Sequence, residues 1–438
     1  MKLDKKSLSL IVIVFVVLAL IVAVPELFND SSDQKKYLTD ARAYYEKDLC
    51  MLAIDEYKKA LSEDDSIEIA LEMAEVYCRA YENGELTRIY TIEKYFDDLL
   101  TEFKEESAAY DVALKFYQKY EDYSSIIEIL TQAKKLNVKS DIISEVTENV
   151  KYKYEIKYSA ITDVQRSVQG FYTVKDGASY YIYDSTMRNV FSRTFDYASV
   201  YINDHLIVKQ NEYVFILNSD GKRVAYLDDN IDFSTGLGGE LFACRSNNIF
   251  SYYNLSGEKV FGEYLFAGRF RDGYAAVQTK QGWTIIDAEG KPVFEKFFED
   301  IKCGSSYESV TNGCFFGKEN GGYYLYNIKG EKVSDLKFDD CDVFVNKDSY
   351  AAVSVAGKWG FINVDGELVI NAQFDSAKSF SNGFAFVTSA EKGFFVDVDG
   401  NKTITGDFKE GDYFNANGLC LVKGDAFWQP IQRYYTLN

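Results

Sequence analysis

A glycine that recurs at nearly constant spacing limits the fold of this chain more than any other feature of its sequence. Consecutive turn glycines lie 36, 33, 40, 36 and 34 residues apart, in the pairs Asp220-Gly221, Ser256-Gly257, Glu289-Gly290, Lys329-Gly330, Asp365-Gly366 and Asp399-Gly400. Each pair separates runs of alternating apolar residues, and glycine accepts the positive φ that a tight hairpin needs. The pattern predicts two-residue hairpins in repeated units, each about as long as a four-stranded sheet.

An aromatic residue often precedes the turn glycine by seven positions, as Phe250, Trp283, Tyr323 and Trp359 do. The clearest copy spans residues 349–382 and contains Lys-Trp-Gly-Phe-Ile at 358–362. This segment resembles the WG repeat family, and weaker copies extend the resemblance over residues 151–438. In one of the weaker copies Trp283 is followed by Thr284 in place of glycine, and in another Gly393 stands where the tryptophan is expected. We expect the signature residues to be structural rather than binding groups: Trp283, Tyr323, Trp359, Gly360, Gly366, Gly400 and Trp428.

The two ends of this repeat region complement one another. Eight units begin at Gly170, Asp204, Gly239, Gly273, Gly313, Ser349, Gly383 and Gly418, and the last has only two strands. Residues 156–161, ahead of the first unit, resemble the second half of a repeat. Together the two halves can complete one blade and remove the exposed sheet edges. We therefore predict a closed β-propeller of about eight blades, with seven blades or an open β-solenoid as the alternatives.

Residues 35–149 have a different period, with apolar residues three and four positions apart, as in amphipathic helices. The first unit resembles the tetratricopeptide repeat in the spacing of Ala41, Tyr44, Tyr45, Ala53, Ile54, Tyr57, Ala60 and Leu61. Further hairpins are predicted at 67–100 and 109–136, followed by a capping helix at 139–150. The resemblance implies a peptide-binding surface that includes Tyr44, Tyr45 and Tyr57, although packing within the hairpins is the alternative role for these tyrosines.

The N-terminal segment predicts a membrane anchor. Residues 7–28 carry no charge before Glu26 and reach the roughly 20 residues that a membrane-spanning helix needs. Lys2, Lys5 and Lys6 precede it, so the positive-inside tendency keeps the N-terminus cytoplasmic and the rest extracytoplasmic. A cleaved signal peptide is the alternative. The predicted organisation is an anchor at 1–29, a helical repeat domain at 30–150 and a β-propeller at 151–438.

The net charge and the cysteine and histidine content limit which partners and cofactors are expected. The formal net charge of -20 makes nucleic acid an improbable partner. The seven cysteines form no C-x-x-C pair, and His205 is the only histidine, so neither a disulfide framework nor a zinc site is expected. Asp397, Asp399 and Asn401 have the spacing of a calcium loop, but no glutamate follows at its twelfth position, which favours a polar hairpin turn.

Sequence signatures of catalysis are missing from the chain, including G-x-S-x-G, H-E-x-x-H and the phosphate-binding loop. We therefore expect no enzyme activity, catalytic residue, metal or cofactor. Acidic clusters such as Asp339, Asp340 and Asp342 leave a carboxylate-based glycoside hydrolase as a remote alternative.

The two repeat resemblances imply protein-protein binding, so the predicted function is that of a membrane-anchored extracytoplasmic scaffold or adaptor in a bacterial cell envelope. A receptor for cell-envelope carbohydrate, such as cell-wall glycan, that uses exposed aromatic residues is the alternative.

Overall fold

The computed structural model describes residues 32–157, 161, 163–168, 170–346 and 350–434. It divides the chain into two compact units, Met1–Asn149 and Val150–Asn438. The predicted anchor at residues 7–28 lies outside the described residues. In the part of the chain that the structure describes, no helix is both long enough and apolar enough to cross a membrane.

The described part of the first unit is helical. Its helices are α2 (Ser32–Tyr45), α3 (Cys50–Glu63), α4 (Ile67–Glu82), α5 (Ile89–Glu102), α6 (Ser107–Lys119), α7 (Tyr123–Leu136) and α8 (Asp141–Val150). Helix α2 packs on α3, α4 contacts both α5 and α6, and α6 packs on α7. Small residues occupy the close approaches, since Ala41, Ala53 and Ala60 are fully buried. Helices therefore occur where the sequence predicts them, whereas the tetratricopeptide resemblance stays a prediction.

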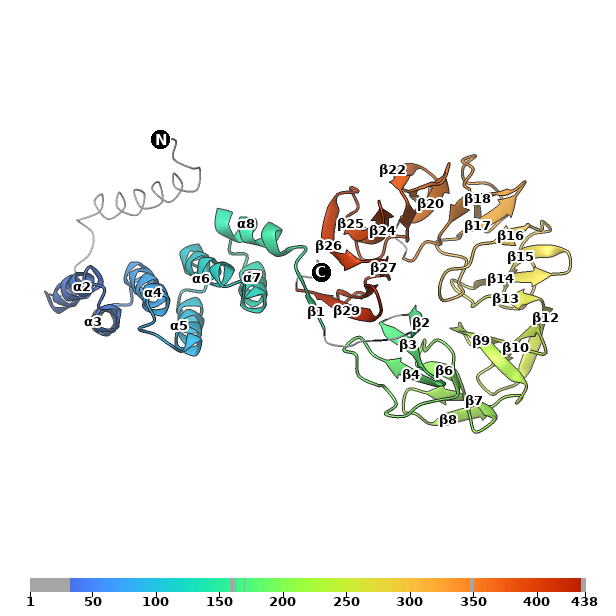
Figure 1. Ribbon diagram of the computed structural model, residues 1–438, viewed down its shortest axis with the longest axis horizontal. Coiled ribbons are helices and arrows are strands. Elements are labelled where there is room, and N and C mark those ends of the chain that lie inside the picture. Colours follow the sequence, from blue (N-terminus) through green and yellow to red (C-terminus); the bar gives the residue numbers. More distant parts are fainter. Residues whose placement is uncertain (1–31, 158–160, 162, 169, 347–349, 435–438) are drawn as a thin grey trace. The chain divides into compact units, whose positions relative to one another are not determined.

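The second unit is a ring of eight antiparallel sheets, each of which is one blade (Figure 1). Blades 1 to 4 contain, in order, β2 (Asp163–Val168), β3 (Phe171–Asp176) and β4 (Ser179–Tyr183); β5 (Tyr197–Ala198), β6 (His205–Gln210), β7 (Tyr213–Asn218) and β8 (Arg223–Tyr226); β9 (Ile231–Gly238), β10 (Leu241–Ser246), β11 (Ile249–Asn254) and β12 (Lys259–Tyr264); and β13 (Phe266–Ala267), β14 (Tyr274–Thr279) and β15 (Gly282–Asp287).

Blades 5 to 8 contain β16 (Asp300–Ile301), β17 (Cys314–Glu319) and β18 (Gly322–Asn327); β19 (Asp340–Cys341), β20 (Ala351–Val355), β21 (Lys358–Ile362) and β22 (Leu368–Phe374); β23 (Ser376–Ala377), β24 (Ala385–Ser389), β25 (Lys392–Val396) and β26 (Lys402–Phe408); and β27 (Glu410–Gly411), β28 (Leu419–Lys423), β29 (Trp428–Arg433) and β1 (Tyr154–Ile156). The prediction of about eight blades is confirmed.

Blade 8 closes the ring with strands from both ends of the repeat region. Strand β1 pairs antiparallel with β29, and Glu155 lies opposite Gln432. Blades 8 and 1 also pack against each other, because Leu419 and Leu421 of blade 8 share a buried cluster with Tyr172 and Val174 of blade 1. The architecture is therefore the closed ring and not the open solenoid.

The predicted units are displaced from the blades by one strand. Each predicted start lies within two residues of the second strand of a blade; Gly313, for example, directly precedes β17. The innermost strand, only two residues long in six blades, comes from the end of the preceding sequence unit. Each sequence repeat therefore supplies parts of two neighbouring blades, which ties adjacent blades together covalently.

The recurring turn glycines lie between the third and fourth strands, but the prediction of two-residue hairpins was wrong. In blade 3 the backbone nitrogen of Asn254 donates to the carbonyl of Glu258 at 3.0 Å, so the loop has three residues. The side-chain oxygen of Asn254 accepts from the backbone nitrogens of Ser256 and Glu258, and Gly257 has φ +84°. An Asn or Asp three residues before the glycine repeats this arrangement at Asn218, Asp287, Asn327, Asn363 and Asp397.

The cores lie between neighbouring blades. Between blades 6 and 7, for example, Phe361 and Ala352 of one blade meet Val387 and Phe394 of the next. Burial of one such large apolar side chain contributes about 1.5 to 3 kcal/mol. Stability therefore depends on each blade having a neighbour on both sides, which a closed ring provides.

Candidate binding site

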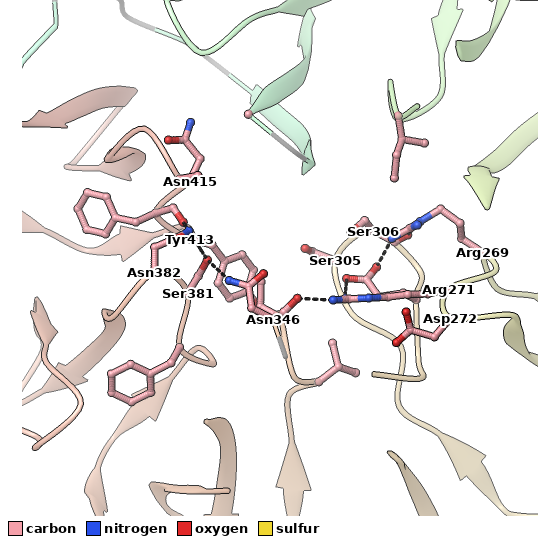
Figure 2. Close-up of a pocket in the computed structure, with 18 of the residues that line it drawn as sticks. Arg269, Arg271, Asp272, Ser305, Ser306, Asn346, Ser381, Asn382, Tyr413 and Asn415 are labelled. Carbon is pink, nitrogen blue, oxygen red and sulfur yellow. Dashed lines mark hydrogen bonds and ion pairs between the residues drawn. The ribbon is translucent and has the colours of Figure 1, made fainter. Parts of the chain in front are cut away.

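A cavity lies at one mouth of the central channel of the propeller. It has a volume of about 940 Å³, and all eight blades contribute to it through the turns between their first and second strands. The turns of blades 2, 4 and 7 are tight two-residue hairpins, with positive φ at Asn203 and Asp204, at Asp272 and Gly273, and at Asn382 and Gly383. We call this cavity the basin (Figure 2).

Neutral hydrogen-bonding side chains make up most of the polar lining of the basin: Asn203, Ser305, Asn346, Ser381, Asn382, Tyr413, Asn415 and Asn417. Several are held in fixed orientations. The Phe414 carbonyl accepts from Ser381 Oγ at 2.8 Å and from Asn382 Nδ2 at 2.6 Å. Phe270, Phe380 and Val345 add apolar surface. The basin thus combines preset donors and acceptors with apolar patches, as ligand sites commonly do.

An insertion in blade 5 lines part of the basin with Ser305, Ser306 and Glu308. Twelve residues, 302–313, separate β16 from β17, whereas six residues, 268–273, separate β13 from β14. The insertion folds on itself, since the Gly304 nitrogen donates to the Glu308 carbonyl at 2.7 Å. It also joins blade 4, because the Tyr307 carbonyl accepts from the Arg269 nitrogen at 2.9 Å. A β-carbon at Gly268 would lie 2.8 Å from that carbonyl oxygen, so the approach requires glycine.

Glu308 is held between two arginines at the tip of this insertion. Its Oε2 lies 3.3 Å from Arg269 Nη2, and its Oε1 lies 3.7 Å from Arg271 Nη1. Arg269 Nε donates to the Ser306 carbonyl, and Arg271 Nη2 donates across the mouth to the Val345 carbonyl at 2.6 Å. Figure 2 shows this group on one wall of the basin and the Asn382 group on the other.

One carboxylate faces two guanidinium groups here, so Glu308 neutralises only one of the two positive charges. Burial alone would raise the pKa of the Glu308 carboxyl, but its hydrogen bonds and the charges of Arg269 and Arg271 lower the pKa below the ordinary value. Glu308 is therefore ionised at neutral pH and serves as the counter-ion of two guanidinium groups.

Asp342 is a second carboxylate near the channel, and it too has internal partners. Its Oδ2 accepts from the Tyr413 hydroxyl at 2.6 Å and from the Ser379 nitrogen at 2.9 Å. Burial and the neighbouring Asp342 charge raise the pKa of Tyr413 well above its ordinary value, so its hydroxyl stays protonated. The pair joins blades 6, 7 and 8 below the basin.

The predicted signature residues lie away from the basin. Trp283, Trp359 and Trp428 are half-buried at equivalent positions of the third strands and pack against clusters between blades. Tyr323 is buried, and its hydroxyl donates to Asp300.

The signature glycines have two separate structural roles. A β-carbon at Gly360 would lie 2.5 Å from the Ile370 carbonyl oxygen of the adjacent strand, so this position permits the close approach of β22. Gly366 and Gly400 have φ of +79° and +82°, which suits their turns.

The three candidate tyrosines of the helical unit differ in exposure. Tyr44 and Tyr45 are half-buried on α2, and the Arg79 guanidinium lies 4.9 Å from the Tyr45 ring centroid. Tyr57 on α3 is only 1% exposed, and its hydroxyl donates to Glu72 Oε2 at 2.8 Å. Tyr44 and Tyr45 therefore keep ring surface for a ligand, whereas Tyr57 lies in the hairpin core.

The acidic residues considered for chemistry have separate structural partners. Asp339 accepts from the Gly357 nitrogen, and Asp340 forms an ion pair with Lys302 at 2.7 Å. Asp397 Oδ1 accepts from the backbone nitrogens of Asp399 and Asn401, as the polar-turn interpretation predicts.

The sequence interpretation missed the basin residues. Gly273, Gly313 and Gly383 were placed only as the starts of repeat units, although Asp272-Gly273, Asn312-Gly313 and Asn382-Gly383 are strong hairpin signals. The 40-residue spacing between Gly290 and Gly330, longer than the others, was the signal of the blade 5 insertion.

Fold and site together define the second unit as an eight-bladed β-propeller with a ligand-sized basin at its channel mouth. The model of the WG containing repeat matches residues 250–283, 325–359 and 359–392, so these parts of the ring are similar to that repeat.

Comparison with known proteins gave no match among curated proteins and several among solved structures. Hsv2 of Kluyveromyces lactis, with loop 6CD replaced by a Gly-Ser linker, is 10% identical; the match covers 65% of this chain and 100% of that chain, with a TM-score of 0.37. Hsv2 of Kluyvelomyces marxianus is 9% identical, with coverage of 61% and 97% and a TM-score of 0.37. A eukaryotic initiation factor is 11% identical, with coverage of 64% and 87% and a TM-score of 0.39.

Proposed function

We propose that this chain is a non-enzymatic scaffold or adaptor that binds protein partners at the basin and is held at a membrane by residues 7–28. A β-propeller built from WG repeats suggests a protein-interaction domain. The helical unit supplies a second surface around Tyr44 and Tyr45. In this proposal everything after the anchor is extracytoplasmic.

The observation that carries the proposal is the composition of the basin. Turns of blades 2, 5, 6, 7 and 8 bring amide and hydroxyl groups to one concave surface, and Glu308 and Asp342 are already bound to internal partners. Fixed neutral donors and acceptors recognise backbone and side-chain polar groups of a partner. General acid-base catalysis instead requires a titratable group within reach of a substrate and ready to exchange its proton.

Site-specific photo-crosslinking in intact cells tests this proposal. A benzophenone side chain replaces Asn382 in the basin, Tyr45 in the helical unit or, as a control, Lys259 on the outer strand of blade 3. We expect a reproducible adduct of defined mass from the Asn382 variant and none from the Lys259 variant. Recovery of the Asn382 and Tyr45 variants only as free monomer would contradict the proposal.

Protease accessibility tests the membrane placement separately. In right-side-out membrane preparations, added protease should remove the propeller while the N-terminus stays protected. Release of the intact chain by a carbonate wash would contradict anchoring.

Carbohydrate binding is the second candidate function, and one observation favours it. Tyr350 and Phe380 form an aromatic pair at the basin wall, with ring centroids 5.6 Å apart, close to the amides of Asn346 and Asn382. Sugar rings pack on aromatic faces while amides bond their hydroxyls. Retention on a glycan array that Tyr350→Ala abolishes would support this function, and no retention of the wild-type chain would dismiss it.

A further inference from the structure

A second concavity, of about 240 Å³, lies at the outer rim between blades 1 and 2. Blade 1, on one side of this concavity, has three regular strands, and blade 2, on the other side, has four. The cavity is lined by Arg193 from the segment after β4 and by residues of β7 and β8, near the lower edge of the ring in Figure 1. We call it the rim pocket.

Aromatic residues form the apolar part of the rim pocket. Tyr213 and Tyr226 are 57% and 52% exposed, and their ring centroids lie 6.0 Å apart. Phe215 lies between them on the same face of the blade and is nearly buried, so it forms the floor. Val224, also on the outermost strand, is 45% exposed. Large apolar groups that gather at one exposed place commonly mark an interaction site.

Two arginines supply the charge of the rim pocket. The Arg223 guanidinium lies 4.1 Å from the Tyr226 ring centroid, which fixes its plane and leaves its edge accessible. Arg193 Nη2 donates to the Gly221 carbonyl at 2.9 Å. Neither arginine has an ion-pair partner among the described residues. In a chain of net charge -20, this is a local concentration of uncompensated positive charge.

Two acidic residues beside the rim pocket are engaged, whereas Glu212, between the lining residues Asn211 and Tyr213, is exposed. Asp220 forms an ion pair with Lys222 at 3.5 Å, and Asp196 Oδ2 accepts from the Asn211 nitrogen at 2.9 Å. No carboxylate belongs to the described lining of the rim pocket. The two guanidinium groups therefore remain available for an external anion, and their planar donors match the geometry of carboxylate and phosphate.

We propose that the rim pocket binds an extended peptide segment of a partner, in which a carboxylate or phosphate stands beside an apolar side chain. The anion would meet Arg193 and Arg223, and the apolar side chain would lie on Tyr213 and Tyr226. Strand β8 is the last strand of its sheet, so an extended peptide backbone can pair with its edge near Arg223, whereas the Tyr226 carbonyl lies against Gly257 of blade 3.

Charge complementarity favours a short acidic segment over a polyanion or an anionic membrane. A short segment meets mainly the two arginines, whereas an extended anionic surface meets the net negative charge of the whole chain. The proposal rests on the protein-binding role proposed above but uses a different surface from the basin.

Selection from a random-peptide display library on the full chain in detergent micelles tests the proposal. The selected peptides are then titrated by fluorescence anisotropy against Arg193→Ser/Arg223→Ser. The matched control is Lys259→Ser/Lys291→Ser, which removes two positive charges elsewhere on the ring. We expect enrichment of Asp or Glu beside an apolar residue, and a loss of affinity on the order of tenfold for each arginine removed, but not in the control. A phosphoserine in place of the acidic residue distinguishes phosphate from carboxylate.

Several outcomes would overturn this inference. Selected peptides that are neutral, or that bind the arginine variant as tightly as the wild type, would contradict it. If Asn382→Ala weakens their binding while the arginine variant does not, the basin proposal survives and the rim pocket proposal fails. Retention on phosphatidylglycerol vesicles, but not on phosphatidylcholine vesicles, that the arginine variant loses would assign the pocket to a membrane surface. Unchanged thermal unfolding of the arginine variant verifies that it folds.

Discussion

Substitution of Glu308 by glutamine should destabilise the propeller strongly, because the carboxylate is the counter-ion of two partly or fully buried arginines. The Glu308 and Arg269 side chains are each only 8% exposed. Removal of one partner from a buried ion pair costs about 3 to 5 kcal/mol. Glutamine keeps one acceptor for Arg269, so we expect a value of about 3 kcal/mol at neutral pH.

Tryptophan fluorescence during urea unfolding measures this effect in the propeller alone. The three tryptophans of the chain, Trp283, Trp359 and Trp428, all lie in its blades, and the helical unit contains none. The Glu308→Gln variant should unfold at a urea concentration lower by roughly 1 M, for a slope of about 3 kcal/mol per M.

The pH dependence of the effect has a definite sign. The pKa of Glu308 is lowered in the folded chain, so its stabilising contribution is present above the unfolded pKa of about 4.3. This contribution is lost as the pH falls through the lower folded pKa. The difference between wild type and Glu308→Gln should therefore be largest near neutral pH and shrink below pH of about 4.3.

Glu289→Gln is the matched control, because Glu289 is an exposed turn residue whose side chain is 72% accessible. It should leave the midpoint unchanged. Equal midpoints for Glu308→Gln and wild type at neutral pH would refute the reasoning. If Glu308→Gln is as much less stable than wild type at pH of about 3 as at neutral pH, lost packing and not lost charge is the cause.

Three further substitutions or reactions test the turns, strands and thiols. Gly360→Ala should destabilise the propeller by about 1 to 3 kcal/mol in urea unfolding, because its β-carbon would meet β22, whereas Gly357→Asn, at φ +76° in open space, should not. Asn254→Ala should cost about 1 kcal/mol through the lost turn hydrogen bonds, and Asn254→Asp, which keeps the acceptor, should restore most of it. Equal effects within either pair would contradict these roles. Iodoacetamide at pH of about 8 should label the buried, unpaired thiols of Cys50, Cys244, Cys341 and Cys420 only after unfolding. Burial raises the pKa of such thiols, to about 12 for Cys244, and the protonated thiol reacts slowly. Rapid labelling of the folded chain at these positions would contradict this.

The fold was largely predictable because its determinants are local and repeated. The alternating strand at 358–362 and the turn at Asp365-Gly366 specify a hairpin without reference to distant residues. The incomplete last unit, together with residues 156–161, was sufficient to predict closure through blade 8. Eight copies of the same local rule leave little freedom in the architecture.

The residue at which each blade begins was not predictable from the length of the sequence repeat. A repeat has the same period wherever its start is placed, and only strand pairing shows that Ser376–Ala377 belongs with β24 in blade 7. The turn type was also missed, because the asparagine three residues before Gly257 acts through hydrogen bonds that a glycine count does not reveal.

The basin depends on non-local contacts, which explains why sequence analysis did not find it. Arg269 of blade 4 meets Glu308 of blade 5 because the blade 5 insertion folds back against blade 4. Likewise, the Arg271 guanidinium reaches the Val345 carbonyl of blade 6. The sequence shows that residues 302–313 are longer than the equivalent segment elsewhere, but not where they turn.

Closure of the ring by β1 and β29 is the central claim, and a disulfide across this pair tests it most directly. Glu155 and Gln432 lie opposite each other in the antiparallel ladder, a separation that a disulfide can bridge. In oxidised Glu155→Cys/Gln432→Cys, mass spectrometry should find one peptide that joins the two positions, and Glu155→Cys/Lys209→Cys should give none. A folded double variant that does not form the 155–432 bond would contradict the closed ring.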